Sequence, residues 1–356
     1  MKKYFLLLLL FSILFVSCSN KDNTIEEEYT PIPYSLEVPE LFKQKLIAPL
    51  IPINNPLTEE GIALGKKLFF DKKLSKDNTQ SCASCHNPRN SFTDSLRFSL
   101  GVDGVPGSRN SMPLFNLGWN FNDKFAWDGK ELSLERQALE PVINPIEMHN
   151  SWSNVALRLQ QDQEYPSMFL NAFGTERIDS TLVTKAIAQF ERTLISGNAK
   201  FDQYLLGNTS LNQQELNGFT IFMSEDKGDC FHCHGGDNNP LWTDNDFHNN
   251  GLDSSFNDLG LGAVTGDLND NGKFKSPSLR NLIYTAPYMH DGRFSTLEEV
   301  INHYSEGLLN SSTIDPLMKK VNQGGVQLTP LEKADLKAFL ITLTDTDFIN
   351  NPSFQN

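Results

Sequence analysis

The sequence predicts a mainly α-helical fold built from two related domains with long loops, and three observations support this prediction. The motif Cys-x-x-Cys-His occurs twice, at residues 82–86 and at residues 230–234. A similar helical segment precedes each copy, and no stretch sustains the alternation of apolar and polar residues that a β-strand would show. With 356 residues and 39% apolar composition, the chain can form two compact domains that each have a core.

The repeated motif has the spacing with which a protein attaches haem covalently. The two cysteines bond to the vinyl groups along one haem edge, and the histidine that follows binds the iron. The alternative is a zinc ribbon, whose two cysteine pairs normally lie about 15 to 20 residues apart. Cys85 and Cys230 are instead 145 positions apart, and each pair has its own histidine. We therefore predict two cytochrome c-like domains, over residues 53–205 and 206–356, each with one covalently bound haem c. The six haem-binding residues would be Cys82, Cys85, His86, Cys230, Cys233 and His234.

The helices are predicted in order along the chain. Residues 57–70 begin with a capping-box-like start at Thr58 and lead into the first motif. Residues 182–194 carry apolar side chains at helical spacing and should form a core helix. Residues 211–222 approach the second motif as residues 57–70 approach the first, which supports two related helical domains.

The N-terminal residues predict export and lipid anchoring. Lys2 and Lys3 precede an apolar run that is too short to span a membrane, as in a secretory signal peptide over residues 1–17. The run ends before Cys18 in a pattern that resembles a bacterial lipobox, so we expect a lipidated Cys18. The alternative is a free thiol, which would be reactive in a secreted chain. Residues 18–52 are polar and rich in proline and should tether the protein to a membrane of the cell envelope, with the domains facing the periplasm or attached to the outer membrane.

The formal net charge of −14 disfavours nucleic acid as a partner, because phosphates bind lysine and arginine. An acidic surface would attract a basic electron-donor protein. It would equally serve solubility alone.

Three further motifs complete a resemblance to a known family. The motifs are Phe125-Ala126-Trp127-Asp128-Gly129, Asn144-Pro145-Ile146-Glu147-Met148 and Ala286-Pro287-Tyr288-Met289-His290-Asp291-Gly292. With them, the chain resembles the bacterial di-haem cytochrome c peroxidases, a family that includes MauG, over roughly residues 55–345. The resemblance implies that the first haem reacts with hydrogen peroxide and that the second accepts electrons from a small donor, a cytochrome c or a cupredoxin.

The resemblance also assigns roles to single residues. Trp127 would carry electrons between the haems. Glu147 would be the acid that moves a proton during cleavage of the peroxide bond, and Gln137 a second polar group beside it. His290 would be a hydrogen-bonding group near the second haem. One calcium ion would be held largely by backbone carbonyls, here those of Asn110, Thr285 and Pro287.

The sequence departs from typical peroxidases of the family at two points. Residues 87–148 contain no histidine, so the ligand that would cap the first iron is missing, and nothing in the sequence supports Met112 as its substitute. Tyr304 stands fourteen residues after His290, where those peroxidases have a methionine. On a predicted helix over residues 297–308, Tyr304 lies on the apolar face and His303 about 100° away. Tyr304 is therefore the predicted second ligand of the second haem iron, a MauG-like pattern.

Three functions remain open from the sequence. The first is a peroxidase that reduces hydrogen peroxide to water. The second is a MauG-like enzyme that oxidises residues of a partner protein, and the third is an electron-transfer cytochrome without peroxide chemistry. Glu147 and the missing cap on the first iron favour an enzyme, since a carrier has no use for an open iron site.

Overall fold

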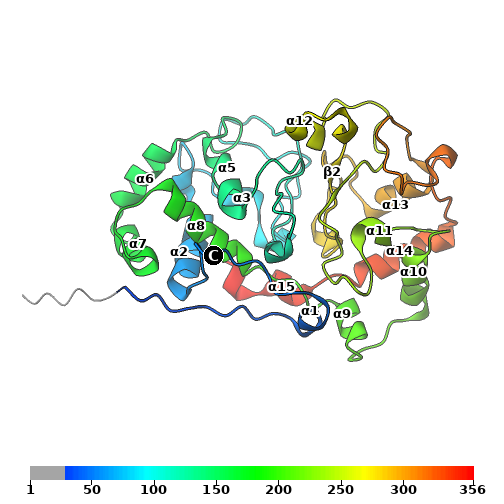
Figure 1. The fold of residues 1–356 in the computed structure, drawn as a ribbon, viewed down its shortest axis with the longest axis horizontal. Helices are drawn as coiled ribbons and strands as arrows, with labels where there is room; N and C mark the ends of the chain where they lie inside the picture. The colour runs from blue at the N-terminus through cyan, green and yellow to red at the C-terminus, as the bar shows by residue number, and fades with distance from the viewer. Residues whose placement is uncertain (1–28) are drawn as a thin grey trace, which may run out of the picture. The chain divides into compact units, whose positions relative to one another are not determined.

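The computed structural model describes residues 29–356, within which Pro31–Asn356 form one compact unit. The predicted signal peptide and Cys18 lie outside the described residues. The unit is mainly helical with long loops, as the sequence predicted, and its two-residue strands β1 (Phe247–His248) and β2 (Phe274–Lys275) pair in antiparallel register (Figure 1). Across residues 29–356, every helix is too short or too polar to cross a membrane.

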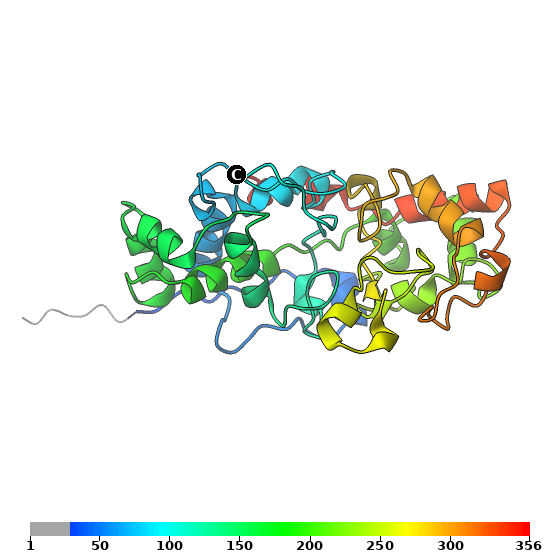
Figure 2. The ribbon, with the colours of Figure 1, turned by 90° about the horizontal axis from the view of Figure 1, so that it is seen from above.

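The helices of the described residues are short, and loops connect them. The α-helices are α1 (Glu40–Lys45), α2 (Glu59–Phe70), α3 (Cys82–Cys85), α4 (Leu134–Gln137), α5 (Glu140–Ile143), α6 (Trp152–Gln160), α7 (Tyr165–Phe173), α8 (Ser180–Arg192), α9 (Lys200–Leu205), α10 (Gln213–Met223), α11 (Phe231–His234), α12 (Leu261–Thr265), α13 (Leu297–Glu306), α14 (Pro330–Ile341) and α15 (Thr346–Asn350). Both views show α2, α6 and α7 at one end of the unit and α10, α13 and α14 at the other (Figures 1 and 2). Single 3-10 turns lie between many of them.

Each end of the unit is built on one closely packed helix pair. Helix α2 packs on α8, and a Cβ atom at Gly65 would lie 1.9 Å from the carbonyl oxygen of Ala186. Helix α10 packs on α14 in the same way, and a Cβ atom at Gly218 would lie 2.0 Å from the carbonyl oxygen of Asp335. Only glycine permits either approach, so the sequence repeat corresponds to a repeat in packing.

The helix starts follow from local capping. The Thr58 hydroxyl accepts a hydrogen bond from the amide of Gly61 and caps α2. Asn212 and Glu215 form a full capping box at the start of α10. Both helices therefore begin close to where the sequence predicted, and each one precedes its motif in the chain.

Two hydrophobic cores lie at the two ends, and their membership crosses the predicted domain boundary. Phe201 of α9 packs in the second core, although it precedes residue 206. Phe348 of α15 packs in the first core, although it lies near the C-terminus. Leu41 and Phe42 of α1 are buried, and Phe42 packs on Trp119, so part of the predicted tether is folded onto the unit. Short apolar segments do not specify which core they join, because that depends on the path of the loops.

Candidate haem sites

Two cavities hold the residues of the repeated motif in their walls. Cys82, Cys85 and His86 line the first cavity. The equivalent residues of the second motif, Cys230, Cys233 and His234, line the second cavity. The structure therefore brings each set of cysteines and histidine to one space.

Both motif histidines are oriented by the same kind of hydrogen bond, from Nδ1 to a backbone carbonyl. The Nδ1 atom of His86 lies 2.9 Å from the carbonyl oxygen of Phe92, and that of His234 lies 3.1 Å from the carbonyl oxygen of Pro277. An Nδ1–H that donates to a carbonyl leaves Nε2 free to bind a metal. Burial lowers the pKa of both imidazoles, that of His234 to about 4, so both are neutral, the form that binds iron.

Two serines support the motifs, and the sequence analysis missed both. The Ser111 hydroxyl donates to the carbonyl of Cys85 at 2.7 Å, and the Ser276 hydroxyl donates to the carbonyl of Cys233 at 3.0 Å. Each serine also lies beside the Nδ1 atom of its histidine, at 3.3 Å and 3.5 Å. Because they are far from the motifs in the chain, no local pattern could have identified them.

The first cavity contains the predicted proton-transfer groups. Glu147 and Gln137 both line it. The Asn144 amide donates to the Glu147 carboxylate at 2.8 Å, and the desolvation of the carboxylate in the cavity wall raises the pKa of Glu147. The side-chain oxygen of Gln137 is buried and has no hydrogen-bond partner among the described residues. Such an orphaned acceptor in a cavity wall fits a bound group that donates to it.

The first cavity offers no histidine that could cap the iron. Among the described residues that line it, His86 is the one histidine. Met112 also lines the cavity, but its backbone lies next to the His86 ring, on the side where Ser111 supports it.

Gly101 supports the loop that carries Glu147, which gives a testable prediction. A Cβ atom at Gly101 would lie 2.2 Å from the carbonyl oxygen of Ile146, so Gly101→Ala must displace residues 146–147. We expect a fall of about tenfold to a hundredfold in peroxide turnover, because small misplacements of a catalytic group cost that much. The measurement is steady-state turnover together with haem content.

The matched control for that substitution is Gly107→Ala in the same loop. Its Cβ atom would meet only ordinary contacts, the nearest at 3.7 Å to the carbonyl oxygen of Ser99. Equal activity of the Gly101 and Gly107 variants would show that the loop does not depend on Gly101.

Trp127 lies between the two cavities and lines both. Its indole Nε1–H donates to the carbonyl of Asn110 at 2.8 Å, and its own carbonyl accepts from the amide of Lys275 at 2.9 Å. Arg109 binds Asp128, the next residue, at 2.6 Å and also binds Asp258 through two hydrogen bonds. Trp127 is therefore held by hydrogen bonds to residues from both halves of the chain.

The second cavity contains Tyr304 on the α13 helix. The Tyr304 hydroxyl accepts a hydrogen bond from the Asn250 amide at 3.1 Å, and burial raises the pKa of Tyr304 to about 12. His303 does not line the cavity; it is buried, and its Nε2 atom lies 3.3 Å from the carbonyl oxygen of Asn250. His290 lines the cavity and stacks on Phe274 with ring centroids 3.5 Å apart.

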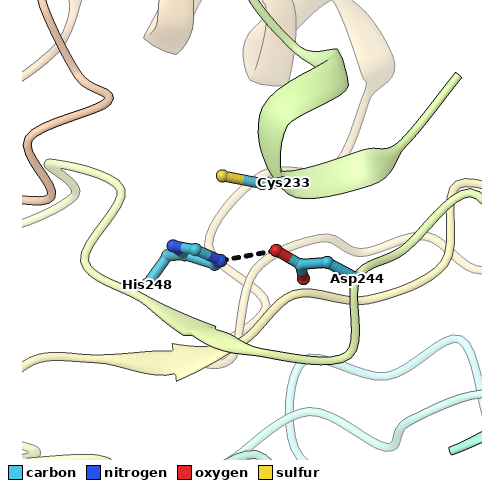
Figure 3. Close-up of side chains that lie close together, drawn as sticks. All are labelled: Cys233, Asp244 and His248. Carbon is cyan, nitrogen blue, oxygen red and sulfur yellow. Dashed lines mark hydrogen bonds and ion pairs between the residues drawn. The ribbon is translucent and has the colours of Figure 1, made fainter.

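A cluster of metal-ligand type lies next to the second motif. Cys233, Asp244 and His248 place their ligand atoms within 4.8 Å of one another, and Figure 3 shows the imidazole turned toward the Asp244 carboxylate. His248 binds Asp244 at 2.8 Å and Asp315 at 2.6 Å. Cys233 belongs to the haem-attachment motif, so this cluster is part of the haem site and is not a separate metal centre.

The three residues predicted for calcium also line the second cavity: Asn110, Thr285 and Pro287. The backbone carbonyl of Asn110 already accepts the indole hydrogen of Trp127. The side-chain amide nitrogen of Asn110 donates to the carbonyl of Leu96 at 2.7 Å, so the side-chain oxygen of Asn110 points away from Leu96.

The two sites define the class of protein. Each site has a haem-attachment motif with an oriented histidine. One cavity contains acid–base groups, the other contains a tyrosine, and a tryptophan lies between them. These are the features of a di-haem c-type redox protein.

Comparisons with known proteins agree. The sequence pattern of the di-haem cytochrome c peroxidases matches residues 59–210. The methylamine utilization protein MauG of Methylorubrum extorquens is 41% identical over 298 residues, which cover 82% of this chain and 80% of that protein. Cytochrome c551 peroxidase of Nitrosomonas europaea is 34% identical over 269 residues, which cover 74% of this chain and 78% of that protein.

A solved structure gives the same result. The crystal structure of a MauG-like protein associated with microbial copper homeostasis aligns with a TM-score of 0.81 at 35% identity, and covers 90% of this chain and 99% of that chain. The chain belongs to the di-haem cytochrome c peroxidase family. It is an oxidoreductase that acts on peroxide, and its family implies two haems c, as the sequence predicted.

Proposed function

We propose that this protein reduces hydrogen peroxide to water at the first haem, with Glu147 as the group that moves the proton and Trp127 as the path for electrons from the second haem. The observation that carries the proposal is the content of the two cavities. Glu147 and the orphaned Gln137 oxygen line the first cavity together with His86, and Trp127 alone among the tryptophans lines both cavities in residues 29–356.

The residues present fit haem in both sites. Bound haem supplies the iron that reacts with peroxide and stores electrons. Glu147 takes a proton from one peroxide oxygen and returns it to the other, and its raised pKa brings it closer to neutral pH, where a proton-transfer group works best. Gln137 accepts a hydrogen bond and orients the substrate. The balance of the reaction is one peroxide, two electrons and two protons to two waters.

A MauG-like oxidation of residues in a partner protein is the second candidate. Tyr304 in the second cavity and the likeness to MauG favour it. In that case, electrons would flow from the partner to the second haem, and Trp127 would have the same place in the path. The identity of the partner, and not the haem sites, separates the two functions.

The setting of the reaction is part of the proposal. A lipidated Cys18 would anchor the chain in the cell envelope with its haem domains in the periplasm, where c-type haem is attached. The electron donor would be a small cytochrome c or cupredoxin, and the strongly negative charge of the chain suits a basic partner. A calcium ion near Asn110, Thr285 and Pro287 would bind through hard oxygen ligands.

The test is steady-state peroxide turnover of the purified protein with a panel of reduced cytochromes and cupredoxins, after a pyridine haemochrome assay of haem content. We expect two haems per chain and turnover with at least one donor. One haem per chain, or zinc in its place, would refute the haem assignment. Two haems without turnover for any donor would favour oxidation of a partner protein.

Tyr304→Phe tests the predicted ligand of the second iron. An anionic oxygen ligand favours the ferric state, so removal of the hydroxyl should raise the midpoint potential of the second haem by on the order of 0.1 V. Spectroelectrochemical titration measures both haems in one sample, and the first haem is the internal reference. The control is His303→Gln, on the same helix but outside the cavity. An unchanged second potential in Tyr304→Phe would mean that Tyr304 does not bind the iron.

A further inference from the structure

The wall between the two haem cavities contains one charged side chain. Trp127, Asn110 and residues 275–278 line both cavities, and Lys275 is the only ionisable residue of this shared wall within the described chain. Lys275 lies on β2, and only 7% of its surface is exposed. A cation in this position acts on both haem sites, because low-dielectric surroundings screen it weakly.

The Lys275 ammonium has neutral partners only. Its Nζ atom donates to the carbonyl of Asn245 at 2.7 Å and to the side-chain oxygens of Asn120 and Asn122 at 3.2 Å and 3.4 Å. It also lies 5.3 Å from the centre of the Phe247 ring. Within residues 29–356, no carboxylate forms an ion pair with it. Burial lowers the pKa of Lys275 to about 7, and the more distant Asp244 and Asp246 carboxylates only partly offset this desolvation.

The other two cations that line the first cavity are already paired. Arg109 binds Asp128 at 2.6 Å and Asp258 at 2.7 Å. Lys130 lies 3.7 Å from Glu131 and 3.5 Å from Glu140. Buried charges in proteins are normally paired, because an isolated one loses its hydration without compensation. Lys275 is the exception.

The haem itself carries the missing anion. A haem has two propionate groups, on the edge away from the two vinyl positions where cysteines attach. The first haem would be attached through Cys82 and Cys85 on the first half of the chain, whereas Lys275 lines the cavity from the second half. Asn120 and Asn245, which hold the ammonium, line the first cavity and not the second, so the charged end of Lys275 belongs to the first cavity.

We propose that Lys275 is the counter-ion of a propionate of the first haem and binds that carboxylate from the wall shared with the second haem. The pair would use one ammonium hydrogen and leave Asn245 as a second acceptor. Since the Lys275 amide also donates to the carbonyl of Trp127, the same residue would connect the first haem to the tryptophan between the sites. The inference rests on haem binding and not on the peroxide chemistry.

The experiment compares Lys275→Met with Lys124→Met in the full chain with both haems attached. Lys124 is a matched control because its ammonium lies 5.5 Å from the same Phe247 ring but it lines neither cavity. After haem content is measured, the midpoint potentials of both haems are titrated, and resonance Raman spectra record the propionate bending bands. Peroxide turnover is measured separately, so a failure of the proposed function is not confused with a failure of this pairing.

With the cation removed, the uncompensated propionate should stabilise the ferric state. We therefore expect Lys275→Met to lower the potential of the first haem, with a smaller change at the second, and to shift a propionate band. Lys124→Met should resemble the wild type, and Lys275→Arg, which keeps the charge, should restore most of the potential. Unchanged potentials and bands in Lys275→Met would overturn the proposal, and so would a shift confined to the second haem.

A second variant covers the case in which Lys275→Met does not fold. Lys275→Gln keeps hydrogen-bond donors for Asn120 and Asn245 but has no charge. Lys275→Gln should lower the midpoint potential of the first haem as Lys275→Met does. An unchanged potential of the first haem in Lys275→Gln would overturn the pairing. The wild-type spectrum gives an independent check: a propionate band of the first haem that does not move between water and deuterium oxide would also contradict a hydrogen-bonded ion pair.

Discussion

Replacement of Glu147 by glutamine is expected to lower peroxide turnover by a factor of about 10² to 10⁴ while both haems stay attached. Glutamine has nearly the same shape, and its amide oxygen can still accept the hydrogen bond that Asn144 donates at 2.8 Å. It cannot take up a proton, so the loss should be in the chemical step. This factor corresponds to about 3 to 5 kcal/mol of barrier.

The pH dependence of the wild type gives a second readout. Desolvation in the cavity wall raises the pKa of Glu147, and the deprotonated form is the one that accepts a proton. Activity should therefore rise with pH through a pKa above the ordinary glutamate value, and this acid limb should vanish in Glu147→Gln.

The control for Glu147 is Glu140→Gln. Glu140 lines the same cavity but is paired with Lys130 at 3.5 Å, so its loss should change turnover little. A Glu147→Gln enzyme as active as the wild type would show that another group transfers the proton.

Asp202→Ala is expected to destabilise the fold by about 3 to 5 kcal/mol, the largest effect on stability that we predict. Asp202 and Arg280 form a doubly hydrogen-bonded ion pair, at 2.7 Å and 2.8 Å, in which both side chains are almost fully buried. Arg280 also donates to the carbonyl of Pro240 at 2.7 Å and lies over the Phe42 ring. Without Asp202, a guanidinium remains buried and unpaired.

Equilibrium denaturation by urea, followed by far-UV circular dichroism, measures this effect. The control is Glu298→Ala, which removes an exposed ion pair with Lys337 and should cost at most about 1 kcal/mol. A double variant, Asp202→Leu with Arg280→Leu, should recover part of the loss, because it removes both charges. Similar losses for Asp202→Ala and Glu298→Ala would mean that the buried pair contributes little.

The two haem-attachment motifs could be predicted from the sequence because their chemistry requires a local pattern. Cysteines and histidine must stand at a set spacing to reach one haem, so residues 82–86 and 230–234 are visible without a structure. The helices before the motifs were predictable for a similar reason, since Thr58 and Asn212 cap them locally. Family motifs added Glu147, Trp127 and Tyr304, and the comparisons confirmed the family and the peroxidase class.

Only the tertiary structure decided how the sites are supported, because those contacts join residues far apart in the chain. Ser111 and Ser276 reach the motif carbonyls from distant loops. Phe201 and Phe348 each pack in the core of the other predicted domain, because the path of the connecting loops decides where a short apolar segment packs. The sequence also could not show that the charge of Lys275 lacks an ion-pair partner, because a lysine in a polar stretch is normally solvated. Only the tertiary structure buries Lys275 between the two cavities, where a charge without an ion-pair partner is energetically costly.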